Sequence, residues 1–157
     1  MKIRFFAVLL AVLTIVSCGK RQVSSYYDAG TQFLNTEADG SITVRASGQG
    51  RNAQDAIEQA WKNAVRDVML KGVNVPGNTL LSKPLITEVN AEEKYSSFIY
   101  SFLADQGEYL NFISTEDKKV GSTDKARNDI QVRRVVTVRI LRQQLKEYLI
   151  QQNIIKP

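Results

Sequence analysis

Hydrophobic and polar residues alternate in two segments of the chain, and this alternation predicts strands. The first segment lies near 41–47 and the second at 129–141, each with one apolar face as in a half-buried strand. A shorter apolar segment near 109–116 predicts a third strand, joined to the last one as an antiparallel hairpin with a long loop. Arg134 interrupts the apolar face of the last strand, which predicts a bulge or a sheet edge there.

Apolar residues at helical spacing predict about three helices, near 52–71, 90–107 and 141–153. Asn52 is the expected N-cap of the first helix and Gly72 its C-cap. Most residues on the apolar stripe of this helix are alanine, and small side chains let a helix lie close to a sheet. The stripe consists of Ala53, Ala56, Ile57, Ala60, Ala64 and Val68.

The second predicted helix carries the aromatic side of the core. Asn90 followed by Glu93 matches a capping box, and Gly107 marks the expected end. The segment before it, 73–89, contains Pro84 and a Pro-Gly turn, so it is expected to be irregular. Its leucines and isoleucine still indicate that it covers part of the core.

The order of these elements is strand, helix, helix, strand, strand, helix. Strands with one apolar face and helices grouped between them favour an α+β fold, with a small, mostly antiparallel sheet packed against the helices. We expect a single domain over 41–157, which is an ordinary size for one core.

The N-terminus has a different pattern. Lys2 and Arg4 precede an uncharged run of thirteen residues, Phe5 to Ser17, whereas a membrane-spanning helix needs about 20 apolar residues. A basic start, a short apolar run and small residues before a cleavage site are typical of a secretory signal, here 1–17.

The end of that run, Ile15-Val16-Ser17-Cys18, resembles the lipobox of bacterial lipoproteins. The resemblance implies that Cys18 becomes the first residue of the mature protein and carries lipid, such as palmitate. Gly19 is not the Asp associated with inner-membrane retention, so the resemblance implies the periplasmic face of the outer membrane. The alternative is an ordinary signal peptide with a fortuitous cysteine.

Residues 18–40 follow the signal and are mostly polar. We interpret them as a lipid anchor and tether between Cys18 and the domain. The alternative is an N-terminal arm that docks on the domain. The large residues that such an arm would use are Tyr26, Tyr27, Phe33 and Leu34.

Composition narrows the possible chemistry. The chain has no histidine and no cysteine besides Cys18, so it lacks the commonest general base and the commonest metal ligand. We therefore expect no metal, no cofactor and no enzymatic activity. The net charge of +5 falls to +3 when Lys2 and Arg4 leave with the signal, which together with export argues against a nucleic-acid partner.

Two local patterns are candidate catalytic or ligand sites. Gly48-Gln49-Gly50, followed by Ala53, matches a dinucleotide-binding loop only in part, and a strand-to-helix turn is favoured. Carboxylates are the remaining acid–base candidates, but those near helix starts are explained by capping and the helix dipole. The carboxylates on the expected helices are Asp55, Glu58, Glu92 and Glu93, and Glu116 and Asp117 lie in the expected hairpin.

Two sets of residues are candidate interaction surfaces. The first is the apolar set in the irregular loop, Leu80, Leu81, Leu85 and Ile86. The second is a basic strip on the last strand, Arg133 and Arg139, which would suit an anionic partner or a membrane surface. A solvated sheet face is the alternative for the strip, and Trp61 is interpreted as a residue at the edge of the core.

The stretch Ile42 to Gly50, with the alanine-spaced helix after it, resembles the envelope-lipoprotein domains of the LPP20 and flagellar-assembly-protein-T amino-terminal group. The resemblance extends to the valine-rich end of the last strand, Val135-Val136-Thr137-Val138. This chain departs from the group in its apolar insertion, 73–103. The resemblance implies a non-catalytic role in assembling or supporting envelope machinery and supplies no site residues.

Taken together, these patterns favour a lipid-anchored interaction or assembly domain. Its expected partners are the lipid bilayer, through acylated Cys18, and another envelope protein; the oligomeric state stays open. Two alternatives remain: a small-ligand binder with a pocket under the 73–89 loop, and a cell-wall hydrolase that uses carboxylates.

Overall fold

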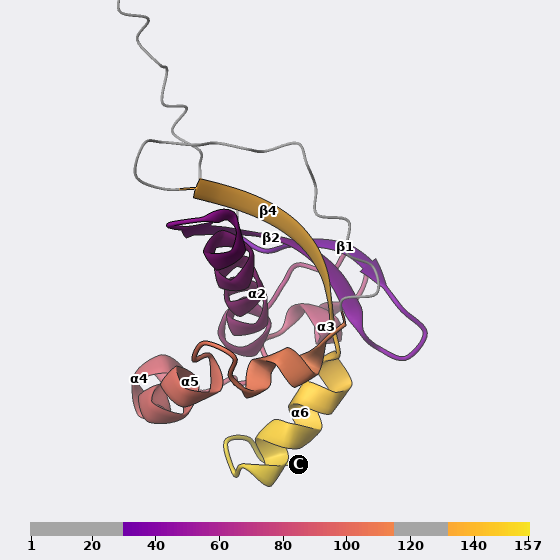
Figure 1. Cartoon of the computed structure of the whole chain (residues 1–157). Helices are drawn as coiled ribbons and strands as arrows, with labels where there is room; N and C mark the ends of the chain where they lie inside the picture. Colours follow the sequence, from indigo (N-terminus) through magenta and orange to yellow (C-terminus); the bar gives the residue numbers. More distant parts are fainter. Residues whose placement is uncertain (1–29, 115–131) are drawn as a thin grey trace, which may run out of the picture.

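The computed structural model describes residues 30–114 and 132–157 (Figure 1). It confirms the α+β fold, with four antiparallel strands in the order β1-β2-β4-β3. The strands are β1 (Gln32–Thr36), β2 (Ile42–Gly50), β3 (Ile113–Ser114) and β4 (Val132–Ile140). The helices are α2 (Ala53–Leu70), α3 (Thr79–Ser82), α4 (Ala91–Lys94), α5 (Ser96–Phe102), the 3₁₀ segment η1 (Glu108–Phe112) and α6 (Arg142–Gln151).

The long central strands β2 and β4 pair over their whole length. Their register runs without a shift from Ile42 opposite Ile140 to Gly50 opposite Val132. Arg134 lies opposite Gly48 inside this ladder, so the bulge expected at Arg134 is wrong, and the strand order places β4 inside the sheet. The irregularity of the sheet lies in β1 instead, after Phe33.

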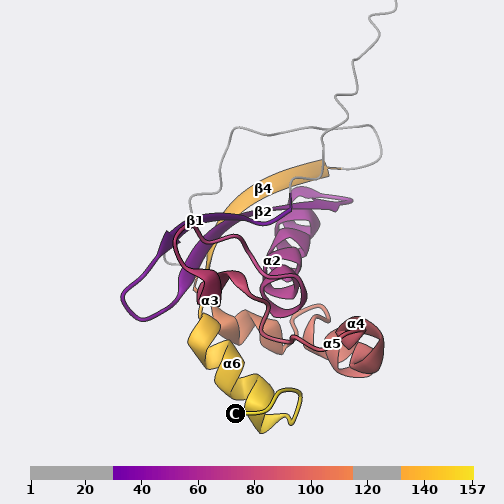
Figure 2. The ribbon, with the colours of Figure 1, turned by 180° about the vertical axis from the view of Figure 1, so that it is seen from behind.

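Helix α2 packs directly against one face of the sheet, which curves over it (Figures 1 and 2). The contact is unusually close because small residues face each other: Ala56, Ala60 and Ala64 are fully buried. A Cβ on Gly48 would lie 2.3 Å from the carbonyl oxygen of Ala56 and from the amide nitrogen of Ala60. The glycines at the end of β2 therefore make room for the helix backbone, which confirms the strand-to-helix interpretation of this motif.

Both ends of α2 form as predicted. The side chain of Asn52 accepts hydrogen bonds from the N–H groups of Gln54 (2.8 Å) and Asp55 (3.0 Å), so it caps the helix. At the other end Gly72 has a φ of +79° and donates its N–H to the carbonyl of Asp67 at 2.7 Å. Glycine adopts this left-handed conformation without steric cost, which terminates the helix.

The second predicted helix is divided into two short helices, α4 and α5, which meet at Tyr95. Asn90 has a φ of +59° and makes no side-chain capping bond, so the capping box expected there is wrong. Helix α5 ends before Gly107. Tertiary packing explains its short length, because its aromatic residues join a compact ring cluster. Ring centroids 5.0–6.3 Å apart connect Phe98, Phe102, Phe112 and Tyr148.

The strand expected at 109–116 forms only at Ile113–Ser114 within the described residues. The preceding residues form η1, in which Tyr109 and Phe112 are both buried. Residues three apart share a face in a 3₁₀ helix, whereas a strand would place these two rings on opposite faces. Burial of both rings therefore favours the 3₁₀ segment. The antiparallel pairing of β3 with β4 confirms the predicted hairpin partners.

The N-terminal arm docks on the domain through β1, which pairs with β2. Phe33 packs against the core, whereas Leu34 is 49% exposed. Tyr26 and Tyr27 lie outside the described residues. The side chain of Asp67 on α2 accepts hydrogen bonds from the Thr31 hydroxyl (2.6 Å) and N–H (3.3 Å). The folded part therefore begins about ten residues before the boundary that the sequence predicted.

Candidate functional site

The apolar loop set predicted as an interaction surface is split by the structure. Leu85 and Ile86 are buried in the core, so their assignment to a surface is wrong, and Leu81 is half-buried. Only Leu80 is largely exposed, at 75%. Leu85 and Ile86 therefore belong to the core that this loop covers.

The two basic residues of β4 lie on the sheet face opposite α2 and are already engaged. Arg133 donates a hydrogen bond to Ser47 Oγ at 3.1 Å, and Arg139 lies 3.7 Å from the carboxylate of Glu37. Both side chains are half-buried. The fold does not bring this strip together with Leu80, and Cys18 lies outside the described residues.

Three of the four candidate carboxylates on the helices pair with cations, and the fourth, Glu93, is exposed on α4. Asp55 lies 3.4 Å from Arg51, Glu58 lies 3.3 Å from Lys62, and Glu92 forms an ion pair with Arg66. Glu116 and Asp117 lie outside the described residues.

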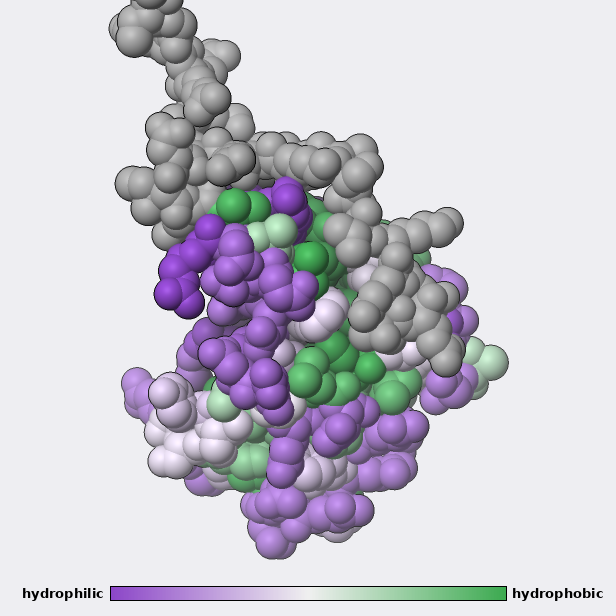
Figure 3. Space-filling model, in the orientation of Figure 1, coloured by the Kyte–Doolittle hydropathy of each residue, from purple (hydrophilic) through white to green (hydrophobic). Residues whose placement is uncertain are grey.

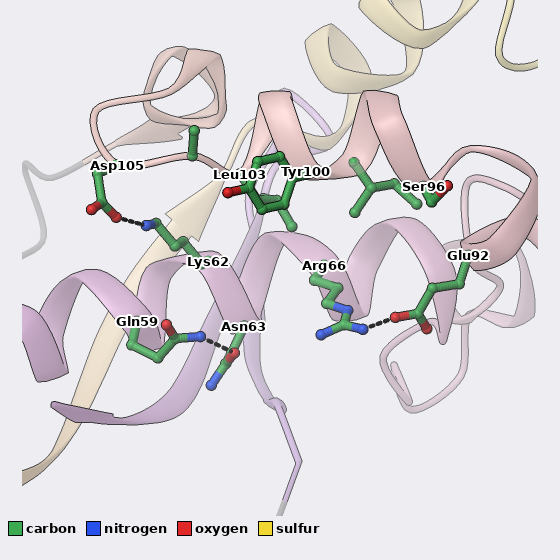
Figure 4. Close-up of a pocket in the computed structure, with 11 residues that line it drawn as sticks. Gln59, Lys62, Asn63, Arg66, Glu92, Ser96, Tyr100, Leu103 and Asp105 are labelled. Carbon is green, nitrogen blue, oxygen red and sulfur yellow. Dashed lines mark hydrogen bonds and ion pairs between the residues drawn. The ribbon is translucent and has the colours of Figure 1, made fainter.

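A groove of about 740 Å³ separates α2 from α4 and α5 (Figure 4). In Figure 3 the polar surface of α2 meets the paler surface of α4 and α5 at the left of the molecule. The volume lies within the range of roughly 300–1,000 Å³ that small-ligand sites occupy. The residues that line it are Gln59, Lys62, Asn63, Arg66, Glu92, Ser96, Ile99, Tyr100, Leu103, Ala104 and Asp105.

One wall of the groove is a polar row on α2. Gln59, Lys62, Asn63 and Arg66 follow helical spacing, so they share one face. Gln59 donates its amide N–H to Asn63 at 2.9 Å, and Asn63 in turn donates to the carbonyl of Ser47 at 2.9 Å. These bonds orient both amides on a helix that the sheet holds rigidly.

Two ion pairs cross the groove (Figure 4). Lys62 pairs with Asp105, and Arg66 pairs with Glu92. The ammonium of Lys62 also lies 3.3 Å from Glu58, and its side chain is only 13% exposed. Burial disfavours its charged form, but hydrogen bonds to Asp105 and Glu58 outweigh this and raise the pKa of Lys62. The same hydrogen bond lowers the pKa of Asp105.

Tyr109 contacts both Glu58 and Lys62 at this end of the groove. Its hydroxyl donates to Glu58 at 3.2 Å, and Lys62 lies 5.8 Å from its ring centroid. Burial, followed by the negative charge of Glu58, raises the pKa of Tyr109. The phenol therefore stays protonated and acts as a fixed hydrogen-bond donor.

The opposite wall is apolar and comes from α5 and the residue that ends it. Ile99, Tyr100 and Leu103 line it, and in Figure 4 Tyr100 stands between the two ion pairs. The ring of Tyr100 is 84% exposed. A large aromatic side chain left in water beside a groove is a contact surface without a partner in the described structure.

Sequence reasoning found neither this groove nor Tyr100. All of its lining residues lie within two helices that the sequence predicted, 52–71 and 90–107, but 43 residues separate Lys62 from Asp105. The sequence pattern that could have indicated the groove was the polar row on α2, on the side opposite its alanine stripe. That row alone is typical of an ordinary solvated helix face.

The chemistry that the groove can offer follows from the side chains that line it. Among residues 30–114 and 132–157, no three acidic, cysteine or histidine side chains are grouped as metal ligands. A general acid needs a raised pKa near neutrality, whereas the pKa of Asp105 is lowered. What the groove offers is a row of planar polar groups facing an exposed aromatic ring.

Comparison with protein-family models, with curated proteins and with solved structures finds no match for this chain. Within the part of the chain that the structure describes, no helix combines the length and hydrophobicity needed to cross a bilayer.

Proposed function

We propose that this protein is a lipid-anchored lipoprotein of a bacterial cell envelope whose domain serves interaction or assembly without catalysis. The observation that carries the proposal is the N-terminal pattern: a basic start, a short apolar run and Ile15-Val16-Ser17 directly before Cys18. A lipid on Cys18 would help to hold the domain at a membrane surface.

The way the chain joins the domain supports a short tether. Thr31 is bonded to Asp67 on α2, so the chain is held at this point of the fold. Thirteen residue steps separate Thr31 from Cys18, and a fully extended chain of that length spans at most about 45 Å. The domain would therefore work within about 45 Å of the bilayer.

The side-chain inventory supports a non-catalytic role. The chain lacks histidine, and the carboxylates around the groove are paired with Lys62 and Arg66. The hydrogen bond from Lys62 lowers the pKa of Asp105, so Asp105 is a poor proton donor. The residue after Cys18 is Gly19 and not the Asp associated with inner-membrane retention. We therefore propose that the protein lies on the periplasmic face of the outer membrane, with another envelope protein as its partner.

The anchor is tested by substituting Cys18 in the native host. Cys18→Ala should abolish incorporation of labelled palmitate and release the protein from the outer-membrane fraction. Ser17→Ala keeps a small residue before the cleavage site and serves as the matched control, which should stay lipidated. If intact-mass analysis of the native protein detects an unacylated chain that still carries residues 1–17, the proposal is contradicted.

The partner is sought by crosslinking in intact cells, followed by mass spectrometry. The proposal expects a specific envelope protein, recovered with the wild type and reduced with Cys18→Ala because the domain leaves the membrane. Recovery of the same protein at the same yield from both variants would contradict a role that depends on anchoring.

A further inference from the structure

The groove between α2 and α5 combines planar polar side chains with an exposed aromatic ring. Five of its side chains end in planar polar groups: the amides of Gln59 and Asn63, the guanidinium of Arg66, and the carboxylates of Glu92 and Asp105. They surround a single exposed aromatic ring, Tyr100. This combination determines which ligand chemistry fits.

Planar polar groups are complementary to neighbouring hydroxyls. A carboxylate presents two acceptors side by side, a guanidinium two donors and an amide one of each, at a spacing that matches two adjacent hydroxyls of a sugar ring. The C–H face of the same ring is apolar and packs flat on an aromatic side chain such as Tyr100. The lining therefore matches the two chemically distinct surfaces of a pyranose.

Hydrogen-bonding capacity remains in the groove after its internal bonds are counted. The amide of Gln59 gives one N–H to Asn63, and its carbonyl oxygen is left for a ligand. Arg66 uses one terminal nitrogen toward one oxygen of Glu92, which leaves a second oxygen and further N–H groups. Asp105, 90% exposed, likewise keeps one carboxylate oxygen.

The apolar wall adds a preference among sugars. Leu103 lies beside Tyr100, across from α2 (Figure 4), and Ile99 also lines the groove. An acetamido substituent has a methyl group for such a wall and an N–H and C=O for the amides. A plain hydroxyl at that position would leave the apolar wall in water.

We infer that this groove binds an oligosaccharide that carries acetamido groups, with a sugar ring stacked on Tyr100. The two cations and two carboxylates of the lining balance in charge, which suits an uncharged polymer better than a strongly acidic or basic peptide. The inference goes beyond the proposed anchoring function and does not depend on lipid at Cys18.

The test is a calorimetric titration of the full-length protein in detergent micelles with chitotetraose, four linked N-acetylglucosamine units. Saturable binding to one site is expected, with weaker binding of cellotetraose, which has hydroxyls in place of the acetamido groups. Tyr100→Ala should weaken binding about tenfold, whereas Tyr100→Phe should retain it because the ring remains. Gln59→Ala should cause a smaller loss.

Leu80→Ala is the matched control, since Leu80 is also a large exposed apolar residue but lies on α3, outside the groove lining. It should bind chitotetraose like the wild type. Cys18→Ala should also bind normally while losing its membrane anchor, so a failure of this inference and a failure of the proposed function give different results.

Three results would overturn the inference. They are the absence of saturable chitotetraose binding at millimolar concentration, binding that Tyr100→Ala leaves unchanged, and binding of a glutamate tetrapeptide in place of the saccharide. Equal affinity for chitotetraose and cellotetraose would overturn the acetamido assignment.

Discussion

The two faces of α2 meet their neighbours in opposite ways. Toward the sheet, alanines lie against glycine backbone, and a Cβ on Gly50 would come within 2.5 Å of Asp55 Cβ. Toward α4 and α5, the same helix presents long polar side chains, and ion pairs of Lys62 and Arg66 cross an open groove. One face leaves no room for any added atom, and the other leaves room for a ligand.

This difference indicates where residues can be substituted without unfolding the domain. Close-packed interiors transmit even small volume changes as strain, so substitutions between α2 and β2 should act on stability. Exposed ion pairs contribute little to stability, so substitutions across the groove should act on binding. Three measurements test this comparison.

The largest effect is expected from Gly48→Ala. The added methyl would lie 2.3 Å from backbone atoms of α2, so the helix must move away from the sheet. We expect a loss of about 3 kcal/mol or more in the free energy of unfolding, measured by urea denaturation. Gly30→Ala is the control, because nothing lies within 4 Å of its added Cβ. Equal stability of both variants would contradict the close contact.

An intermediate effect is expected from Asn52→Ala, which removes the N-cap of α2. Two helix N–H groups, of Gln54 and Asp55, lose their acceptor, and such a loss costs about 1 kcal/mol. Thermal unfolding followed by circular dichroism measures it. Gln54→Ala, which changes an exposed residue beside the cap, should leave the midpoint nearly unchanged.

The smallest effect on stability is expected from Asp105→Asn, at the groove. Its hydrogen bond with Lys62 lowers the pKa of Asp105, so the folded state binds this proton less readily than the unfolded chain. The contribution of this hydrogen bond to the free energy of unfolding is therefore present at neutral pH and is lost as pH falls below about 4. Denaturation at pH 7 and pH 2.5 should show a slight difference between variant and wild type only at pH 7. A difference that persists in acid would contradict this origin.

Parts of the fold that depend on nearby residues were predicted well. The alternation of β2 and β4, the alanine stripe of α2 and its cap at Asn52 are all local patterns, and they formed where expected. The lipobox at Cys18 is local too, and it stays a prediction. Local patterns succeed because backbone propensity and side-chain period act over a few neighbouring residues.

Parts that depend on remote contacts were mispredicted or missed. Tyr109 and Phe112 share a buried face, so η1 replaced an expected strand. Asn90 took a left-handed turn instead of capping a long helix. At η1 the burial of two large rings decided the backbone, because such burial outweighs weak local preferences.

The sequence by itself determined the order of the main elements, the small-residue contact between β2 and α2, and the absence of histidine chemistry. Only the tertiary structure decided that Leu85 and Ile86 are buried, that Thr31 is fixed to Asp67, and that Tyr100 faces a polar row across a groove. The reason is physical: helical period and residue size are properties of a segment, whereas burial and opposition of side chains arise when segments far apart in the chain pack together.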